Sequence, residues 1–221
     1  MSASMAEFTE AIEHLAPGGT LVLTDVSWDE YEQLIAELGE GYAVRVSYDH
    51  GRLEIMSPSS KHEKYSELML GLVDVIADVM DYDLESFGST TFKSQKLAKG
   101  SEPDTCFYIQ KAASVTGKDT LDLAVDPPPD IAVEVDISHK SFLKFTFYAE
   151  IGVPEIWRCD DKGVEIYHLT GQRYVEAQVS RAFPFLTSDT LSEYLELAKT
   201  KSRASVLRSF RLWLRSTGGQ K

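Results

Sequence analysis

The chain has 221 residues, of which 43% are hydrophobic and 10% aromatic, enough for a single domain (1–221) with a substantial core. The 14 glycines, 8 prolines and 2 cysteines exclude a collagen, a low-complexity chain and a disulfide-stapled miniprotein. No apolar run approaches the roughly 20 residues of a membrane-spanning helix, and the acidic start is unlike a signal peptide. We therefore expect a cytoplasmic protein that does not bind membranes, with its cysteines reduced.

The formal charge of −13 is unevenly distributed along the chain. All 35 acidic residues lie before Lys199, whereas 7 of the 22 basic residues lie at or after it, so residues 1–198 carry −20. Such a charge repels polyanions at long range, which disfavours nonspecific binding of nucleic acid. A site that gathers divalent cations remains compatible with it.

The first predicted elements are a helix, a hairpin and a second, longer helix. Ser27-x-x-Glu30 is a capping box that precedes apolar residues at helical spacing. Two β-like runs at 42–48 and 52–56 flank a short turn and indicate a hairpin. Apolar residues at helical spacing then predict a long helix over 61–80.

The rest of the chain is predicted to be mostly strands, with a helical C-terminus. A short aromatic-rich helix is expected near 141–150, and a basic amphipathic helix over 196–217. Strands are expected at 84–92, 105–110, 130–137, 155–159, 164–169 and 173–178. The fold class is therefore mixed α/β, with helices covering a central sheet.

The strand at 130–137 is the most informative segment for function. Because side chains alternate between faces, Asp130, Glu134 and Asp136 share one face with Ala132, opposite an aliphatic face. Either this is the solvated face of an amphipathic strand, or the carboxylates line a metal-binding or catalytic cleft. In a cleft, a cation would offset their mutual repulsion.

Asp104 and Lys144 favour the cleft. Asp104 follows a proline at the start of the strand at 105–110, where it is either a turn residue or a cross-strand neighbour of Glu134. Two carboxylates and a backbone carbonyl suit Mg²⁺ or Mn²⁺, which can activate water and stabilise charge on a phosphodiester oxygen. Lys144, in an otherwise apolar helical turn, either extends to solvent or pairs with these carboxylates and assists the attacking water.

Pro103-Asp104, followed by Glu134-Val135-Asp136, resembles the PD-(D/E)XK nuclease signature with its final lysine replaced by Asp136. Further segments occur in the order found in the Uma-two family of restriction-endonuclease-like proteins, which is abundant in cyanobacteria. These segments are Gly51–Pro58, His62, Glu102–Asp104, Asp130–Val135 and Tyr148–Trp157, the last containing Gly-Val-Pro-Glu-Ile-Trp. The resemblance covers about residues 25–195.

The resemblance implies a restriction-endonuclease-like core at 25–195, with a mixed, mainly four-stranded sheet between helices. It implies that Asp104, Glu134 and the carbonyl of Val135 bind the metal, and that Lys144 replaces the missing signature lysine. His62 matches a recurrent histidine, which is either catalytic or a hydrogen-bonded packing residue. Asp136, in the signature lysine's place, is also a candidate catalytic residue.

We therefore expect a Mg²⁺-dependent endonuclease that hydrolyses DNA. Two alternatives stay open: a catalytically silent binding or assembly module, favoured by the acidic body and the replaced lysine, and a hydrolase of small phosphodiesters. Arg208, Arg211 and Arg215 line one side of the C-terminal helix, which either docks through its apolar side or contacts phosphates. Its aromatic residues also suggest a homodimer.

Overall fold

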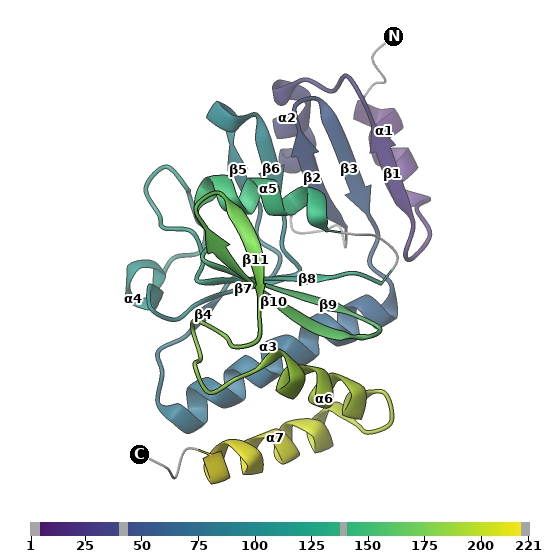
Figure 1. Ribbon diagram of the computed structural model, residues 1–221. Helices are drawn as coiled ribbons and strands as arrows, with labels where there is room; N and C mark the ends of the chain where they lie inside the picture. Colours follow the sequence, from purple (N-terminus) through teal and green to yellow (C-terminus); the bar gives the residue numbers. More distant parts are fainter. Residues whose placement is uncertain (1–4, 40–43, 138–140, 218–221) are drawn as a thin grey trace.

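The computed structural model describes residues 5–39, 44–137 and 141–217, which form two β-sheets packed with helices (Figure 1). The helices are α1 (Met5–Glu13), α2 (Trp28–Leu38), α3 (Ser60–Met80), α4 (Ala112–Val115), α5 (Phe142–Ile151), α6 (Ser188–Ala198) and α7 (Arg203–Thr217), with a 3₁₀ turn η2 (Gln95–Leu97). The strands are β1 (Thr20–Leu23), β2 (Arg45–Asp49), β3 (Arg52–Met56), β4 (Glu85–Ser86), β5 (Phe92–Ser94), β6 (Lys99–Ser101), β7 (Thr105–Tyr108), β8 (Ile131–Val135), β9 (Glu155–Asp160), β10 (Gly163–Thr170) and β11 (Arg173–Ala177).

The two sheets differ in size and strand direction. The smaller sheet has the order β1-β3-β2-β6-β5 and its strands pair antiparallel. The larger sheet has the order β11-β10-β9-β8-β7-β4, in which β8 and β9 run parallel and the other pairs antiparallel. Parallel neighbouring strands need a crossover connection, and helix α5 forms the one between β8 and β9. Mixed strand direction and helices on the sheet confirm the expected fold class.

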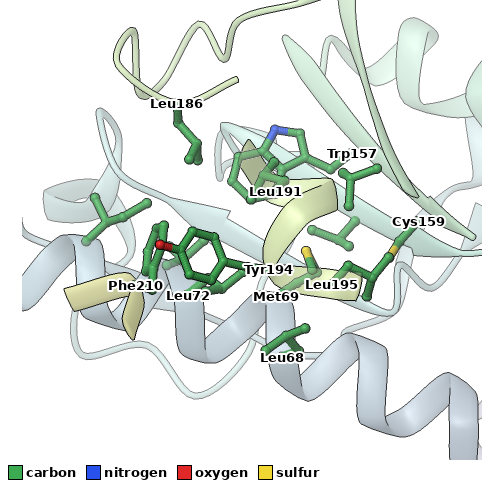
Figure 2. Close-up of a cluster of buried hydrophobic side chains, with 14 of the residues drawn as sticks. Leu68, Met69, Leu72, Trp157, Cys159, Leu186, Leu191, Tyr194, Leu195 and Phe210 are labelled. Carbon is green, nitrogen blue, oxygen red and sulfur yellow. The ribbon is translucent and has the colours of Figure 1, made fainter. Parts of the chain in front are cut away.

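The main core lies between the larger sheet and the helices α3, α6 and α7. Ser59 caps α3 by accepting the His62 N–H at 3.3 Å, and the apolar stripe of α3 is buried. Figure 2 shows the centre of this core, formed by Leu68, Met69 and Leu72 of α3 with Trp157, Cys159, Leu186, Leu191, Tyr194, Leu195 and Phe210. A second buried cluster joins α1 and α2 to the smaller sheet. The aliphatic face of β8 is thereby fixed toward α3, which leaves its other face for the site.

Several expected elements differ from the structure. The expected strand at 84–92 is divided into β4 and β5, because Gly88 adopts a φ of +54° and bends the chain between them. Helix α1 and strand β1 are additional elements, and the larger sheet has six strands where four were expected. Residues 42 and 43 of the expected 42–48 strand lie outside the described residues, and β2 begins at Arg45.

The C-terminal segment 196–217 is not one helix. Residues up to Ala198 end α6, and α7 starts at Arg203, because both helices bury apolar residues that must pack on each other and on α3. Arg211 forms an ion pair with Asp78 of α3, and Arg203 donates hydrogen bonds to the carbonyl oxygen of Glu67. These contacts are those of a docked amphipathic helix. Among the described residues, no helix combines the length and hydrophobicity needed to cross a membrane.

Candidate active site

Strand pairing brings the two predicted metal-binding carboxylates together. In the antiparallel β7–β8 pair, Thr105 lies opposite Val133, and the Asp104 N–H donates to the Val133 carbonyl at 3.0 Å. Continuing this register by one residue places Asp104 opposite Glu134, with both side chains on the same face. All five residues of β8 are buried, so the solvated-face interpretation of this strand is wrong.

Asp104 is held by groups from three directions. Its side chain is 2% exposed, and Oδ2 accepts the Val135 N–H at 2.6 Å and lies 3.1 Å from His62 Nε2. Burial alone would raise the pKa of Asp104, but His62, the Lys144 charge and the Val135 N–H together hold it below its usual value. The other oxygen, Oδ1, is buried and accepts no hydrogen bond. Asp104 is therefore an ionised carboxylate with one oxygen that accepts no hydrogen bond and lies 3.5 Å from Arg45 Nε.

Glu134 is contacted by two residues of α5 that are one helical turn apart. Its Oε2 accepts a hydrogen bond from Lys144 Nζ at 2.8 Å, and its Oε1 accepts one from the Tyr148 hydroxyl at 2.5 Å. Burial, together with the negative charge of Asp104, raises the pKa of Glu134 to about 8, although Lys144 and Tyr148 oppose that rise. Asp104 and Glu134 thus differ in proton affinity although they are neighbours.

The Lys144 ammonium is oriented inward, not toward solvent. Its side chain is 15% exposed, and Nζ also donates to the carbonyl oxygen of Glu102 at 3.0 Å. Burial disfavours the ammonium, but Glu134 and Asp104 raise its pKa above the usual value, so it stays charged. The structure therefore places Lys144 with the two carboxylates, as the sequence suggested.

The remaining candidates occupy supporting positions. His62, 3% exposed, faces Asp104 from the first turn of α3. Asp136 accepts the Ser141 N–H at 2.9 Å and Arg158 Nε at 2.5 Å, so its two oxygens fix the start of α5 and a neighbouring arginine. The N–H of Val135 contacts Asp104, while the role of its carbonyl as a metal ligand stays a prediction.

Asp130, on the same face of the strand, belongs to a loop anchor and not to the carboxylate pair. It accepts the backbone N–H groups of Ile109 and Lys111 at 2.8 and 3.1 Å.

A pocket of about 130 Å³ opens onto these groups at the junction of the two sheets. Asp104, Glu134, Val135, Asp136 and Lys144 line it from the larger sheet and α5. The smaller sheet contributes Arg45, Tyr48, Arg52, Glu54 and Lys99, among others. The pocket therefore has walls from both sheets and a carboxylate pair between them.

The donor set fits a divalent ion with few protein ligands. Within the described residues, no three His, Cys, Asp or Glu side chains are grouped to hold a metal. Mg²⁺ nevertheless often uses only one or two carboxylates and keeps several waters. The Asp104 oxygen without a hydrogen bond is a position for such a ligand bond, and Glu134 oxygens retain further lone pairs. Asp104 and Glu134 thus suit Mg²⁺ or Mn²⁺.

Sequence reasoning missed three residues around the pair: Arg45, Tyr148 and Arg158. Tyr148 could have been found, because it lies four residues after Lys144 and so shares its helix face. Arg158 lies opposite Glu134 in the parallel β8–β9 register, and that pairing cannot be read from local sequence. Arg45 precedes the alternating buried residues Val46 and Tyr48, a pattern that gives no sign of a role in the site.

Comparison with known proteins shows the family of this chain and a solved structure that it resembles. The crystal structure described as a "putative nuclease belonging to DUF820" from Anabaena variabilis ATCC 29413 superposes with a TM-score of 0.53 at 19% identity, covering 77% of this chain and 99% of that chain. At this identity the match establishes a shared fold. No curated protein matches. The family model described as "Uma2: Putative restriction endonuclease" matches residues 28–200, and with that match over most of its length the chain belongs to the Uma2 family.

Proposed function

We propose that this protein is a metal-dependent nuclease that hydrolyses DNA phosphodiester bonds. The observation that carries the proposal is the buried pair of carboxylates, Asp104 and Glu134, side by side on adjacent strands with the Lys144 ammonium on Glu134. Membership of a family described as "Putative restriction endonuclease" and the shared fold support the same conclusion.

Asp104, Glu134 and the carbonyl of Val135 would hold Mg²⁺ or Mn²⁺. Such an ion, when bound, supplies an activated water and stabilises charge on a phosphodiester oxygen. Two of the three ammonium donors of Lys144 are used by Glu134 and Glu102. The third donor is left to orient the attacking water. His62 keeps Asp104 in place, and Tyr148 does the same for Glu134.

Plasmid cleavage with Mg²⁺ or Mn²⁺ tests the proposal. Wild type should cleave, whereas Asp104→Asn and Glu134→Gln should lose at least 100-fold in rate, because each removes a charged ligand while keeping the side-chain shape. The matched control is Glu176→Gln, which alters an exposed carboxylate on the edge strand β11 and should cleave like wild type. Cleavage that survives both site substitutions refutes the mechanism.

A hydrolase of small phosphodiesters is a second candidate. Both carboxylate side chains are 2% exposed, and residues 1–198 carry −20, which opposes the approach of duplex DNA. Turnover of a chromogenic phosphodiester without plasmid cleavage would favour this candidate. Absence of Mg²⁺ or Mn²⁺ binding in calorimetry at millimolar concentrations would instead favour a catalytically silent module.

We also propose a homodimer, since two-fold assemblies are the commonest oligomers and paired cuts of duplex DNA require two sites. Sedimentation that shows only the 24.7 kDa chain at micromolar concentration would refute it.

A further inference from the structure

Arg45 reaches the candidate site from the smaller sheet. It begins β2 and lines the same pocket as Asp104, Glu134 and Lys144, although it belongs to a different sheet. Its side chain is 13% exposed. The terminal nitrogens donate to Glu63 Oε1 at 3.2 Å and to the Val44 carbonyl at 3.3 Å. The guanidinium Nε makes neither of these contacts and faces Asp104.

Arg45 Nε and the Asp104 oxygen that it faces are too far apart for a hydrogen bond. Arg45 Nε and Asp104 Oδ1 lie 3.5 Å apart, which is ion-pair range, yet both atoms are buried and neither makes a hydrogen bond. Leaving a buried polar group unsatisfied costs about 1–3 kcal/mol, and more for a charged one. Such a group calls for an explanation, and a site that is completed by a ligand is one. The complementary ligand carries an anionic oxygen for Arg45.

Each of the other cations that line the pocket makes a shorter ion pair with one carboxylate than Arg45 makes with Glu63 or Asp104. Lys144 pairs with Glu134, Lys99 with Glu150 at 2.8 Å, and Arg52 with Glu54 at 2.7 Å. Among the pocket-lining cations of the described chain, Arg45 alone combines a buried nitrogen with an unmet hydrogen bond. An anionic substrate entering this acidic protein would therefore compete at Arg45 only with these longer ion pairs.

We propose that Arg45 binds a non-bridging oxygen of the substrate phosphodiester. The inference rests on the proposed function and extends it, because it assigns a substrate-binding residue to the smaller sheet. A guanidinium is suited to this task, since its planar donors match phosphate oxygens and it remains charged at all accessible pH values. The smaller sheet then supplies one wall of the active site and is not an accessory layer.

Binding of bis(4-nitrophenyl) phosphate without metal, measured by titration calorimetry, tests the role of Arg45 separately from hydrolysis. Arg45→Met should weaken binding at least tenfold, because it removes a charge-assisted hydrogen bond. Arg45→Lys keeps the charge but not the planar donors and should lie between Arg45→Met and wild type. The control Arg173→Met, at an exposed position of the edge strand β11, should bind within twofold of wild type.

Urea unfolding of each variant identifies loss of fold, and if Arg45→Met does not fold, Arg45→Lys decides. Equal affinity of the Arg45 variants and wild type overturns the inference, as does absence of binding by wild type. Adding Mn²⁺ then measures turnover of the same compound, where the Arg45 variants should show a raised KM. Arg45-dependent binding without turnover by wild type would refute hydrolysis of this class of substrate and leave the assignment of Arg45 intact.

Discussion

Replacing Lys144 by methionine tests whether the buried ammonium stabilises Glu134. Methionine has similar length but cannot donate, so Glu134 would keep only its hydrogen bond from Tyr148. Removing one partner of a buried ion pair costs roughly 3–5 kcal/mol. Because Tyr148 remains, we expect about 3 kcal/mol at pH 9, where Glu134 is ionised.

The loss should depend on pH with a definite sign. The folded-state pKa of Glu134 is raised from 4.5 to about 8, so at pH 6 the carboxyl holds a proton and needs no counter-charge. The cost of Lys144→Met should then fall to about 1 kcal/mol, the worth of a hydrogen bond. Proton uptake by Glu134 itself also stabilises the fold below pH 4.5 and ceases to do so as the pH rises through 8.

A double-mutant cycle measures the pairing directly. Urea unfolding, followed by tryptophan fluorescence, gives the free energy of unfolding for wild type, Lys144→Met, Glu134→Gln and the double variant. We expect the double variant to lose about 2 kcal/mol less than the sum of the single losses at pH 9, because it leaves no unpaired charge. Additivity within about 0.5 kcal/mol at pH 9 would refute the buried pairing.

Three further predictions follow from the same geometry. Affinity for Mn²⁺ should rise between pH 6 and 9, because a proton on Glu134 competes with the ion. Calorimetry in buffers of different ionisation enthalpy should register the release of that proton. An affinity that does not change with pH would contradict this prediction. Asp136→Ala should lower the free energy of unfolding by about 3 kcal/mol. The loss for Asp136→Asn should be about 1 kcal/mol smaller than the loss for Asp136→Ala, because asparagine can still accept the Ser141 N–H. Equal losses in urea unfolding would contradict the anchoring of α5 by Asp136. Arg211→Met should cost under about 1 kcal/mol, because its pair with Asp78 is largely exposed, and should leave plasmid cleavage unchanged; slower cleavage would indicate a phosphate contact by α7.

Elements defined by local periodicity were predicted correctly. The helix expected over 61–80 is α3, because its apolar spacing and its cap are both local in sequence. The two-residue alternation of 130–137 correctly gave the aliphatic face of β8 and the face that bears Glu134. Asp104, Glu134 and Lys144 were chosen from residue type and order, and the structure brings them to one pocket.

Features that depend on tertiary pairing were not predicted. Arg45 enters the site only because the smaller sheet packs beside β8, and nothing near it in sequence signals this arrangement. The ion pair of Asp136 with Arg158 likewise requires the parallel register of β8 and β9. The division of 84–92 into two strands in different sheets depends on the bend at Gly88, and the strand-like pattern of this segment does not indicate that bend.

The order in which the chain visits its two sheets has an evolutionary consequence. From β4 in the larger sheet the chain crosses to β5 and β6 in the smaller sheet. It then returns to the larger sheet at β7, which begins directly after Asp104. Neither sheet is therefore formed by a continuous stretch of sequence (Figure 1). Recombination at a single breakpoint cannot replace one whole sheet and keep the other. A single breakpoint between β3 and α3 would exchange β1–β3, which carry most of the smaller sheet's pocket residues, but would leave β5 and β6 with the strands that carry the carboxylates.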